Sequence, residues 1–185
     1  MTLADPYPEN LDEQSIQARA TSYRCGKTTL YDSADQMLWE ANPAAVWFVI
    51  PPNQHRSEIE LAAERGIAIF AEKPQTLFYD EAAHQAQAIR ATGVISTAGF
   101  QMRYDPWYVS LSDYTRERAV TSITMVDTGG IEGHGVKRTH TEEMGGPGNR
   151  IWTANRAWPG SSVVEAGINQ SDLMRYWTHD EIDWV

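Results

Sequence analysis

Two short apolar runs, at residues 46–50 and 67–71, constrain the fold of this chain more than any other feature. Each run gives way abruptly to proline and polar residues, which is typical of a strand buried on both faces whose carboxyl end opens into a loop. The segment between them, residues 57–65, is polar and alanine-rich and is closed by Gly66, so it predicts a helix. A helix between two consecutive strands is typical of a parallel crossover. The sequence therefore predicts an α/β fold.

Further strands and helices are expected before and after this unit. In chain order they are the end of a strand at 2–5, a helix at 9–20, a strand-like connection at 23–31, a short helix capped by Ser33, a helix at 81–91, a strand at 94–98 and a helix at 104–117. After residue 117 the pattern changes. Loose alternation at 119–127 predicts a strand of a second sheet, residues 128–159 a long loop over the cleft, and residues from Ser161 or Ser162 to Trp177 a last helix.

These patterns predict two parts of unequal size. Residues 1–117 are expected to form a domain with a Rossmann-like parallel sheet. Residues 118–185 are expected to begin an α+β domain. The apolar residues at 182–185 have the pattern of an opening strand.

Composition narrows the class of ligand. The 185 residues carry a formal net charge of −10, which opposes binding to nucleic acid or to an anionic membrane through the overall field, so a small molecule is expected. No apolar run is long enough to span a bilayer and no signal-peptide pattern opens the chain, so we expect a cytoplasmic protein. The single cysteine excludes an internal disulfide and a thiolate metal site.

The loops after the two central strands hold the first candidate site residues. In open α/β sheets ligands bind outside the carboxyl ends of the strands, where His55 and the pair Glu72-Lys73 are expected. Lys73 is the best candidate for a group that exchanges a proton with a reacting hydroxyl. The alternative for Lys73 is a solvated side chain in a tight Lys-Pro turn. His55 could bond a cofactor or cap a helix that begins near Gln54.

An ordered set of motifs resembles the Gfo/Idh/MocA family of nicotinamide-dependent oxidoreductases. The motifs are Asp5 at a strand end, the loop from Pro51 to His55, the turn Glu72-Lys73-Pro74, the stretch from Gly99 to Pro106, and the imperfect helix motif from Glu165 to Asp172. Each motif alone is weak, but the ordered set extends over nearly the whole chain. The resemblance implies hydride transfer between NAD(P) and a hydroxyl of a sugar-like or polyol-like substrate. It also implies that residues 1–117 are a partial nucleotide-binding domain and that residues 118–185 begin a domain for substrate binding and dimer contact.

The resemblance also implies roles for individual residues. Those expected to bind the cofactor are Asp5, Pro51, Asn53, His55, Glu72, Lys73 and Arg103. Those expected to bind substrate are Lys73, Arg103, Glu165, Asn169 and Asp172, and the catalytic set is Lys73, Asp172 and Asn169. NAD is preferred to NADP, because the carboxylate of Asp5 would bond a ribose diol and repel a 2′-phosphate. Arg103 could anchor the nicotinamide amide or a substrate anion, or only brace its loop through Asp105.

The last helix departs from the family pattern. Glu165, Asn169, Asp172 and Tyr176 are spaced by four, three and four residues, which places them on one face. A polar stripe is usually solvated surface, whereas the resemblance implies that this face points into the substrate cleft. Asn169 stands where the family has a histidine, and Glu165 where it has an aspartate. An amide cannot shuttle a proton near neutral pH, so Asn169 can orient a hydroxyl but cannot act as the base.

Two expected parts of the family pattern are missing from this sequence. It has no G-x-G-x-x-G turn, and the first strand and most of the last sheet have no counterpart. We therefore expect a chain truncated at both ends that self-associates, binds a dinucleotide poorly and is inactive alone. A rival hypothesis is a non-catalytic remnant or interaction subunit. A third is a metal-dependent lyase or hydrolase that uses His134 and His140 with nearby glutamates, although no metal site is predicted because a surface loop explains them better.

Overall fold

The computed structural model describes residues 1–126 and 162–183. The chain divides into two compact units, each made of several segments. The first unit consists of Met1–Phe48, Arg56–Phe70 and Ala83–Thr97, and the second of Val49–His55, Ala71–Ala82 and Ala98–Val185. The domain boundary near residue 117 stays a prediction.

The first unit begins with a two-stranded parallel sheet. Strand β1 (Thr2–Ala4) pairs in parallel with β2 (Thr29–Tyr31), and helix α1 (Glu13–Ser22) connects them. Asp12 caps α1 by accepting a hydrogen bond from the Ser15 amide, so the helix begins later than predicted, after a 3₁₀ turn at Pro8–Leu11.

Helix α2 (Ala34–Ala41) leads from this sheet to the next one. The hydroxyl of Ser33 caps it by accepting from the Gln36 amide, as predicted. Asn42 ends the helix in the left-handed conformation. Met37 and Leu38 are buried, and α2 contacts both β1 and helix α3 (Glu58–Glu64).

The second sheet has the order β3-β4-β5, with β3 at Ala45–Phe48, β4 at Ala68–Ala71 and β5 at Ser96–Ala98. Helix α3 joins β3 to β4, and α4 (Tyr79–Thr92) joins β4 to β5. The Ile69 amide bonds the Ile95 carbonyl, and the Gly99 amide bonds the Ala71 carbonyl. A donor on β4 is thus followed by a donor just after β5, and such alternation between two strands is typical of a parallel ladder. The predicted strand-helix-strand unit is confirmed.

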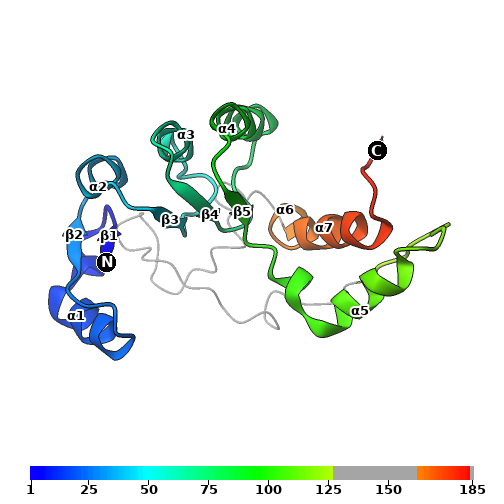
Figure 1. The fold of residues 1–185 in the computed structure, drawn as a ribbon, viewed down its shortest axis with the longest axis horizontal. Coiled ribbons are helices and arrows are strands. Elements are labelled where there is room, and N and C mark those ends of the chain that lie inside the picture. The colour runs from blue at the N-terminus through cyan, green and yellow to red at the C-terminus, as the bar shows by residue number, and fades with distance from the viewer. Residues whose placement is uncertain (127–161, 184–185) are drawn as a thin grey trace. The chain divides into compact units, whose positions relative to one another are not determined.

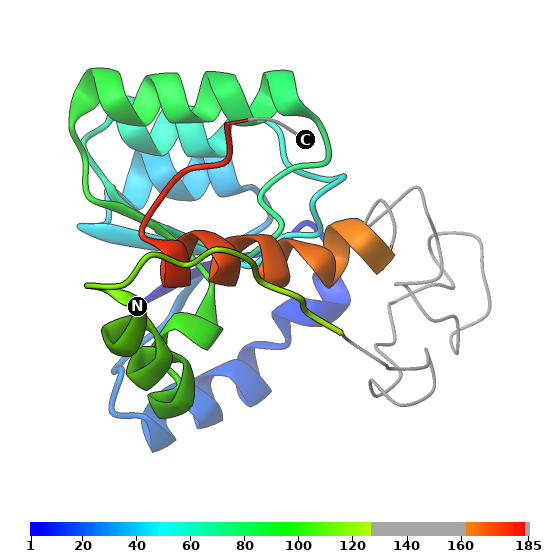
Figure 2. The same cartoon turned by 90° about the vertical axis from the view of Figure 1, so that its right-hand side faces the viewer.

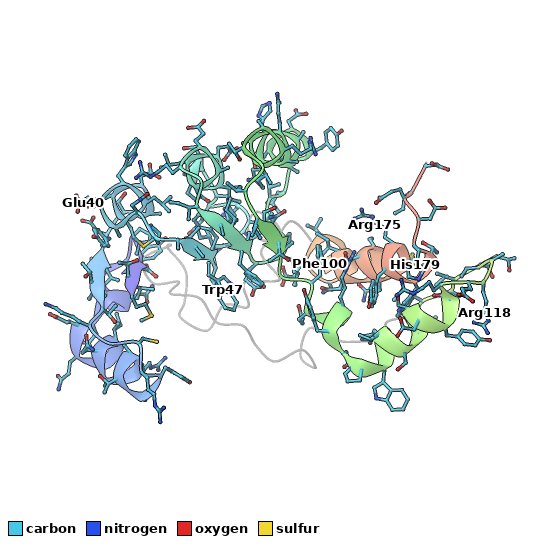
Figure 3. The ribbon with its side chains drawn as sticks, in the orientation of Figure 1. Glu40, Trp47, Phe100, Arg118, Arg175 and His179 are labelled. Atoms are coloured by element: carbon cyan, nitrogen blue, oxygen red, sulfur yellow. The ribbon has the colours of Figure 1, made fainter. Side chains whose placement is uncertain are left out.

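The prediction that the central strands are buried on both faces is wrong. Val46 and Phe48 are buried, but Trp47 between them is 63% exposed and points away from the helices (Figure 3). The reason is that α2, α3 and α4 all lie on one side of the sheet (Figure 1), and no described helix covers Trp47. Its ring instead stacks against Phe70, with centroids 4.4 Å apart.

The second unit is built on a pair of packed helices, α5 (Pro106–Thr115) and α7 (Gly167–Thr178), which lie close together in Figure 2. A 3₁₀ turn at Gln101–Tyr104 precedes α5. The hydroxyl of Ser112 donates to the Tyr176 carbonyl at 3.1 Å, and the indole N–H of Trp177 donates to the Tyr108 carbonyl at 3.2 Å. These bonds satisfy polar groups that the packing of the two helices buries.

Two predictions for the second unit are wrong. Residues 119–126 form no strand, because no described strand lies beside them to complete a hydrogen-bonded ladder; most of them line a groove together with residues of α5 and α7. The predicted last helix is interrupted: α6 (Ser162–Glu165) ends before α7 begins. The loop predicted at 128–159 lies outside the described residues, as do Trp184 and Val185. Among the described helices none is long and apolar enough to cross a membrane.

Candidate functional site

The side chain of Lys73 is held by two oxygen atoms of one residue. The loop after β4 carries Lys73, and its Nζ lies 2.9 Å from the main-chain oxygen of Glu165 and 3.1 Å from Oε1 of the same residue. The two side chains are only 13% and 8% exposed. The alternative of a solvated lysine is therefore wrong. A buried ammonium needs such oxygens, because burial without them would cost several kcal/mol.

This contact coincides with the break between α6 and α7. In a continuous α-helix the Glu165 carbonyl would accept from the amide of Asn169. Here the Asn169 amide donates instead to the Ala166 carbonyl at 3.0 Å. The Glu165 carbonyl is thereby available to Lys73. The lysine ammonium donates a hydrogen bond to this backbone oxygen at the point where the helix breaks.

Arg103 and Asp172 form a second ion pair in the same unit. The guanidinium donates from Nε to Oδ2 at 2.8 Å and from Nη2 to Oδ1 at 2.6 Å, a two-point contact. The hydrogen bond to Asp172 raises the pKa of Arg103 above its usual value. The Tyr176 ring lies 5.2 Å from the guanidinium carbon. Arg103 does not brace its loop through Asp105, because the Asp105 carboxylate caps α5 by accepting from the Trp107 amide.

The polar stripe on the last helices is not solvated surface. Glu165 and Asp172 are buried, with 6% and 5% exposure, and Asn169 is half-buried. The side-chain oxygen of Asn169 is shielded from solvent and accepts no hydrogen bond from any residue in the described segments. A buried carbonyl oxygen of this kind favours a ligand that can donate to it. The alternative of a solvated stripe is wrong.

Gly99 and Glu72 approach each other closely at the ends of β5 and β4. A Cβ atom added at Gly99 would lie 2.5 Å from Oε2 of Glu72 and 3.3 Å from its Cα. Only glycine fits there without movement of Glu72. The side chain of Glu72, the glutamate expected to help bind a cofactor, thus lies against Gly99, while the ion-pair partner of Lys73 is Glu165, 92 residues along the chain.

The loop after β3 forms a turn in which the Gln54 amide bonds the Pro51 carbonyl at 2.8 Å. His55 is buried, with 8% exposure. Helix α3 begins only at Glu58, with Ser57 at its N-cap position, so the prediction that His55 caps a helix starting near Gln54 is wrong. The side-chain oxygen of Asn53 is shielded from solvent and has no hydrogen-bond donor among the described residues.

Asp5 lies in the first unit, directly after β1. Its Oδ1 accepts from the Tyr7 amide at 2.9 Å and its Oδ2 from the Asn10 side chain at 3.0 Å. Each carboxylate oxygen can accept more than one hydrogen bond. These local bonds therefore orient the carboxylate and leave it able to accept from a further donor.

The sequence analysis did not predict that Lys73 bonds the main-chain oxygen of Glu165. One feature of the sequence could have indicated the helix break there, namely Gly167 within an otherwise helical pattern. No sequence pattern indicated the ion pair of Arg175 and Glu181, in which Nη2 lies 2.6 Å from Oε1. Figure 3 shows Arg175 and His179 near the end of α7. Within residues 1–126 and 162–183 no group of three or more metal-ligating side chains is found. His134 and His140 lie outside those segments.

Comparison with known proteins places these residues in a family. A model described as "Oxidoreductase family, NAD-binding Rossmann fold" matches residues 9–100, which include the loops carrying His55 and Lys73. Scyllo-inositol 2-dehydrogenase (NAD(+)) of Bacillus subtilis is 31% identical over 150 residues, which are 81% of this chain and 40% of that protein. The chain belongs to the Gfo/Idh/MocA family.

Other similar proteins extend the comparison. D-xylose 1-dehydrogenase (NADP(+)) 2 of Haloferax volcanii is 30% identical over 110 residues, covering 58% of this chain and 34% of that protein. A crystal structure of scyllo-inositol dehydrogenase from Lactobacillus casei, with bound NAD(H) and scyllo-inositol, matches with a TM-score of 0.69 and 22% identity. That match covers 99% of this chain and 49% of the other, and it confirms the Rossmann-like α/β fold. The chain spans less than half the length of these relatives.

Proposed function

We propose that this chain supplies the substrate-facing residues of an NAD(P)-dependent dehydrogenase that acts on a hydroxyl of a sugar or polyol. The observation that carries the proposal is the buried contact of Lys73 with the carbonyl and carboxylate of Glu165. It keeps a proton donor in a shielded position after a sheet strand, where α/β proteins bind ligands. The activities for which the relatives are named, on scyllo-inositol and D-xylose, support this substrate class.

The residues present fit parts of a nicotinamide dinucleotide. When bound, such a cofactor supplies or accepts the hydride. Asp5 has acceptor capacity for a ribose diol, and the shielded oxygen of Asn53 favours a donor group of a ligand. A glycine-rich turn for the pyrophosphate is not part of these 185 residues. Full affinity for the dinucleotide therefore requires contacts with its pyrophosphate in addition to those of Asp5 and Asn53.

Proton transfer at the substrate oxygen is assigned to Lys73. An ammonium has three N–H donors, and two of them bond Glu165. The third can donate to a carbonyl oxygen as that oxygen becomes a hydroxyl, and the neutral amine takes the proton back when the hydroxyl is oxidised. Glu165 stabilises the ammonium form and fixes its direction, so it acts as a positioning residue.

Asn169 and Asp172 are assigned different tasks. The amide of Asn169 cannot carry a proton, but its shielded oxygen can accept from a second substrate hydroxyl and so orient a polyol. Asp172 bonds Arg103 with both oxygens, which favours holding the arginine over exchanging a proton. The predicted catalytic role of Asp172 stays a prediction, as does contact of Arg103 with substrate or cofactor.

Binding experiments test the substrate side without requiring turnover. Saturation-transfer NMR with scyllo-inositol and D-xylose should show contact with the wild-type chain. Asn169→Ala should weaken that contact, and Lys27→Met, a change at an exposed lysine, should leave it unaltered. Equal signals for all three proteins, or no signal at saturating polyol, would contradict the proposal. The preference for NAD over NADP is tested separately, by comparing the quenching of tryptophan fluorescence by NADH and NADPH.

A second candidate function is an interaction subunit without its own turnover. The observation that favours it is the exposure of large apolar side chains, among them Trp47 of β3 at 63% and Val49 in the loop that follows at 71%. We also propose that the isolated chain self-associates, that it is inactive alone, and that the protein is cytoplasmic. Sedimentation at several protein concentrations tests the first of them.

A further inference from the structure

The chain turns back on itself at the end of α7. His179 ends this helix in the left-handed backbone conformation, with φ at 55°, which is uncommon for residues other than glycine. Its Nε2 lies 3.0 Å from the main-chain oxygen of Ser112 on α5. A carbonyl oxygen only accepts, so Nε2 carries the proton and donates. After this turn Glu181 reaches Arg175, six residues before it, which a continuous helix would not allow.

A pocket of about 400 Å³ lies at this turn, within the second unit. Figure 3 shows the side chains of Arg175 and His179 at this end of α7. The volume is in the range of pockets that hold small ligands. The lining residues are Arg103, Arg175, Tyr176, His179, Asp180 and Glu181. Such a charged lining favours a polar or charged ligand.

The two arginines of the pocket are held in the same way. Arg103 donates from Nε and Nη2 to the carboxylate of Asp172. Arg175 donates from Nε and Nη2 to the carboxylate of Glu181. A guanidinium has five N–H donors, and neither Nη1 bonds an acceptor in the part of the chain that the structure describes. Each arginine therefore keeps three N–H donors for a further acceptor.

The two guanidiniums lie close enough to repel each other. The hydrogen bond to Glu181 raises the pKa of Arg175, whereas the positive charge of Arg103 acts in the opposite direction. An anion beside both cations offsets this repulsion and gains charge-assisted hydrogen bonds. The hydrogen bond from Arg175, and in addition the charge of Arg103, lower the pKa of Glu181. Glu181 is thus the anion that this chain itself places beside the two arginines.

The carboxylate of Glu181 is held weakly. Its side chain is 74% exposed and that of Arg175 is 43% exposed, so the pair contributes little to stability. Glu181 also belongs to no helix or strand. By contrast, the side chain of Asp172 is 4% exposed where it bonds Arg103. An external anion can therefore displace Glu181 at small cost, while Asp172 keeps Arg103 oriented.

We propose that Arg103 and Arg175 bind the phosphate group of a small ligand, and that Glu181 occupies this position when the ligand is absent. A phosphate group presents at least three acceptor oxygens, enough to bond both arginines, whereas a carboxylate presents two. Asp180 also lines the pocket, and its Oδ1 accepts from the Glu181 amide at 2.8 Å. Its charge opposes the anion, so we expect a dissociation constant on the order of 1 mM.

The test uses inorganic phosphate as the probe. The side-chain Nε–H signals of Arg103 and Arg175 are followed by NMR while phosphate is added to the whole chain. Sodium chloride of equal ionic strength is the control for screening, and acetate is the control for a planar carboxylate. Phosphate should give saturable shifts with a midpoint on the order of 1 mM, and acetate should bind at least about tenfold more weakly.

Two variants test the arginine and the glutamate. Arg175→Gln should weaken phosphate binding at least about tenfold, because it removes charge-assisted hydrogen bonds. Glu181→Gln should tighten phosphate binding about threefold or more, because the competing carboxylate is gone. The matched controls are Arg116→Gln and Asp113→Asn, which each remove one partner of the exposed ion pair on α5. Both controls should leave the affinity for phosphate unchanged.

Titration of the Glu181 carboxyl gives a second readout that needs no variant. Sulfate is the probe here, since it stays a dianion at the acidic pH values where a carboxyl group titrates. Saturating sulfate should raise the NMR midpoint of Glu181 toward its ordinary value of about 4.5, because the hydrogen bond from Arg175 is then lost. Sodium chloride of equal ionic strength should raise this midpoint less.

Several results would overturn the proposal. These are phosphate shifts that match those of sodium chloride, equal binding of acetate, unchanged affinity in Arg175→Gln, and no gain in Glu181→Gln. An equal gain in Asp113→Asn would assign the effect to overall charge, which also contradicts the proposal. Circular dichroism confirms that each variant folds, and the two wild-type titrations decide the matter if one does not. All of these readouts are independent of dehydrogenase activity.

Discussion

The Nζ of Lys73 lies 2.9 Å from the main-chain oxygen of Glu165, at the residue where the last helical segment breaks. One side chain therefore bonds a backbone group that a continuous helix would have used internally. The break and the shielded oxygen of Asn169 occur within five residues of the chain, and Lys73, 92 residues from Glu165 in sequence, belongs to the same compact unit. Removal of the ammonium should therefore alter both the helix break and the surroundings of Asn169.

The first prediction concerns stability. Lys73→Met removes the ammonium from a buried carboxylate, so we expect the free energy of unfolding to fall by about 3 kcal/mol in urea titrations. In the double variant Lys73→Met/Glu165→Gln the loss should be smaller, because no buried charge remains. Lys27→Met, at an exposed lysine, should change stability by less than about 0.5 kcal/mol. Additive losses in the double variant would show that the pair is not coupled.

The second prediction concerns the pair of Arg103 with Asp172. The arginine side chain is 37% exposed and the aspartate 4%, so solvent screens the pair in part. We expect Asp172→Asn to lower the free energy of unfolding by about 2 kcal/mol. Arg103→Lys should also destabilise, since lysine cannot make the two-point contact.

A matched pair on α5 provides the control for this experiment. Arg116 and Asp113 form an ion pair at 3.0 Å whose side chains are 61% and 64% exposed. Asp113→Asn should therefore cost less than about 0.5 kcal/mol. Equal effects of Asp113→Asn and Asp172→Asn would show that burial does not strengthen the Arg103 pair.

The third prediction concerns the close approach at the ends of β4 and β5. Gly99→Ala places a methyl group 2.5 Å from Oε2 of Glu72, so the glutamate side chain must move. We expect a loss of about 1–2 kcal/mol in unfolding free energy. Glu72→Ala should reduce the cost of Gly99→Ala, because the nearest contact is then gone. Thermal or urea unfolding of the four proteins in this cycle measures the coupling, and zero coupling would refute the contact.

The fourth prediction concerns pH. The hydrogen bond from Arg175 lowers the pKa of Glu181 below its ordinary value of about 4.5. Because the pKa of Glu181 is lower in the folded state, the ion pair stabilises the folded state at pH values above the pKa of the unfolded state. This stabilisation is lost as the pH falls through the pKa of the folded state. NMR titration of the Glu181 carboxyl should therefore give a midpoint below 4.5 in the wild type and a higher one in Arg175→Gln. An unchanged midpoint in the variant would contradict the assignment.

The helices and strands could be predicted because each is indicated by residues within or next to it in the sequence. The alternation of apolar runs with Gly66-closed helical segments indicated β3, α3 and β4, and Ser33 indicated the start of α2. Burial of both faces of β3 could not be predicted correctly. The face of Trp47 depends on which elements cover it, and this is a property of the tertiary arrangement.

The candidate site could be predicted only as a set of residues. Lys73, Arg103, Glu165 and Asp172 were each named from motifs, but their pairing joins positions 92 and 69 residues apart. No periodicity encodes which lysine meets which glutamate. The strand expected at 119–127 was wrong for a related reason, since a period-two pattern describes a strand only where a partner strand completes its ladder.

The most direct test of the proposed function is NADH formation from a polyol and a sugar by the chain carrying an N-terminal fusion of a strand and a glycine-rich turn. Wild-type fusion and its Lys73→Met variant are compared on scyllo-inositol and D-xylose, after urea titration confirms that both are folded. We predict that the wild-type fusion forms NADH and that Lys73→Met lowers kcat at least about 100-fold, the usual effect of removing a proton-transfer group. Equal kcat in the two fusions would contradict the assignment of Lys73 and with it the proposed site.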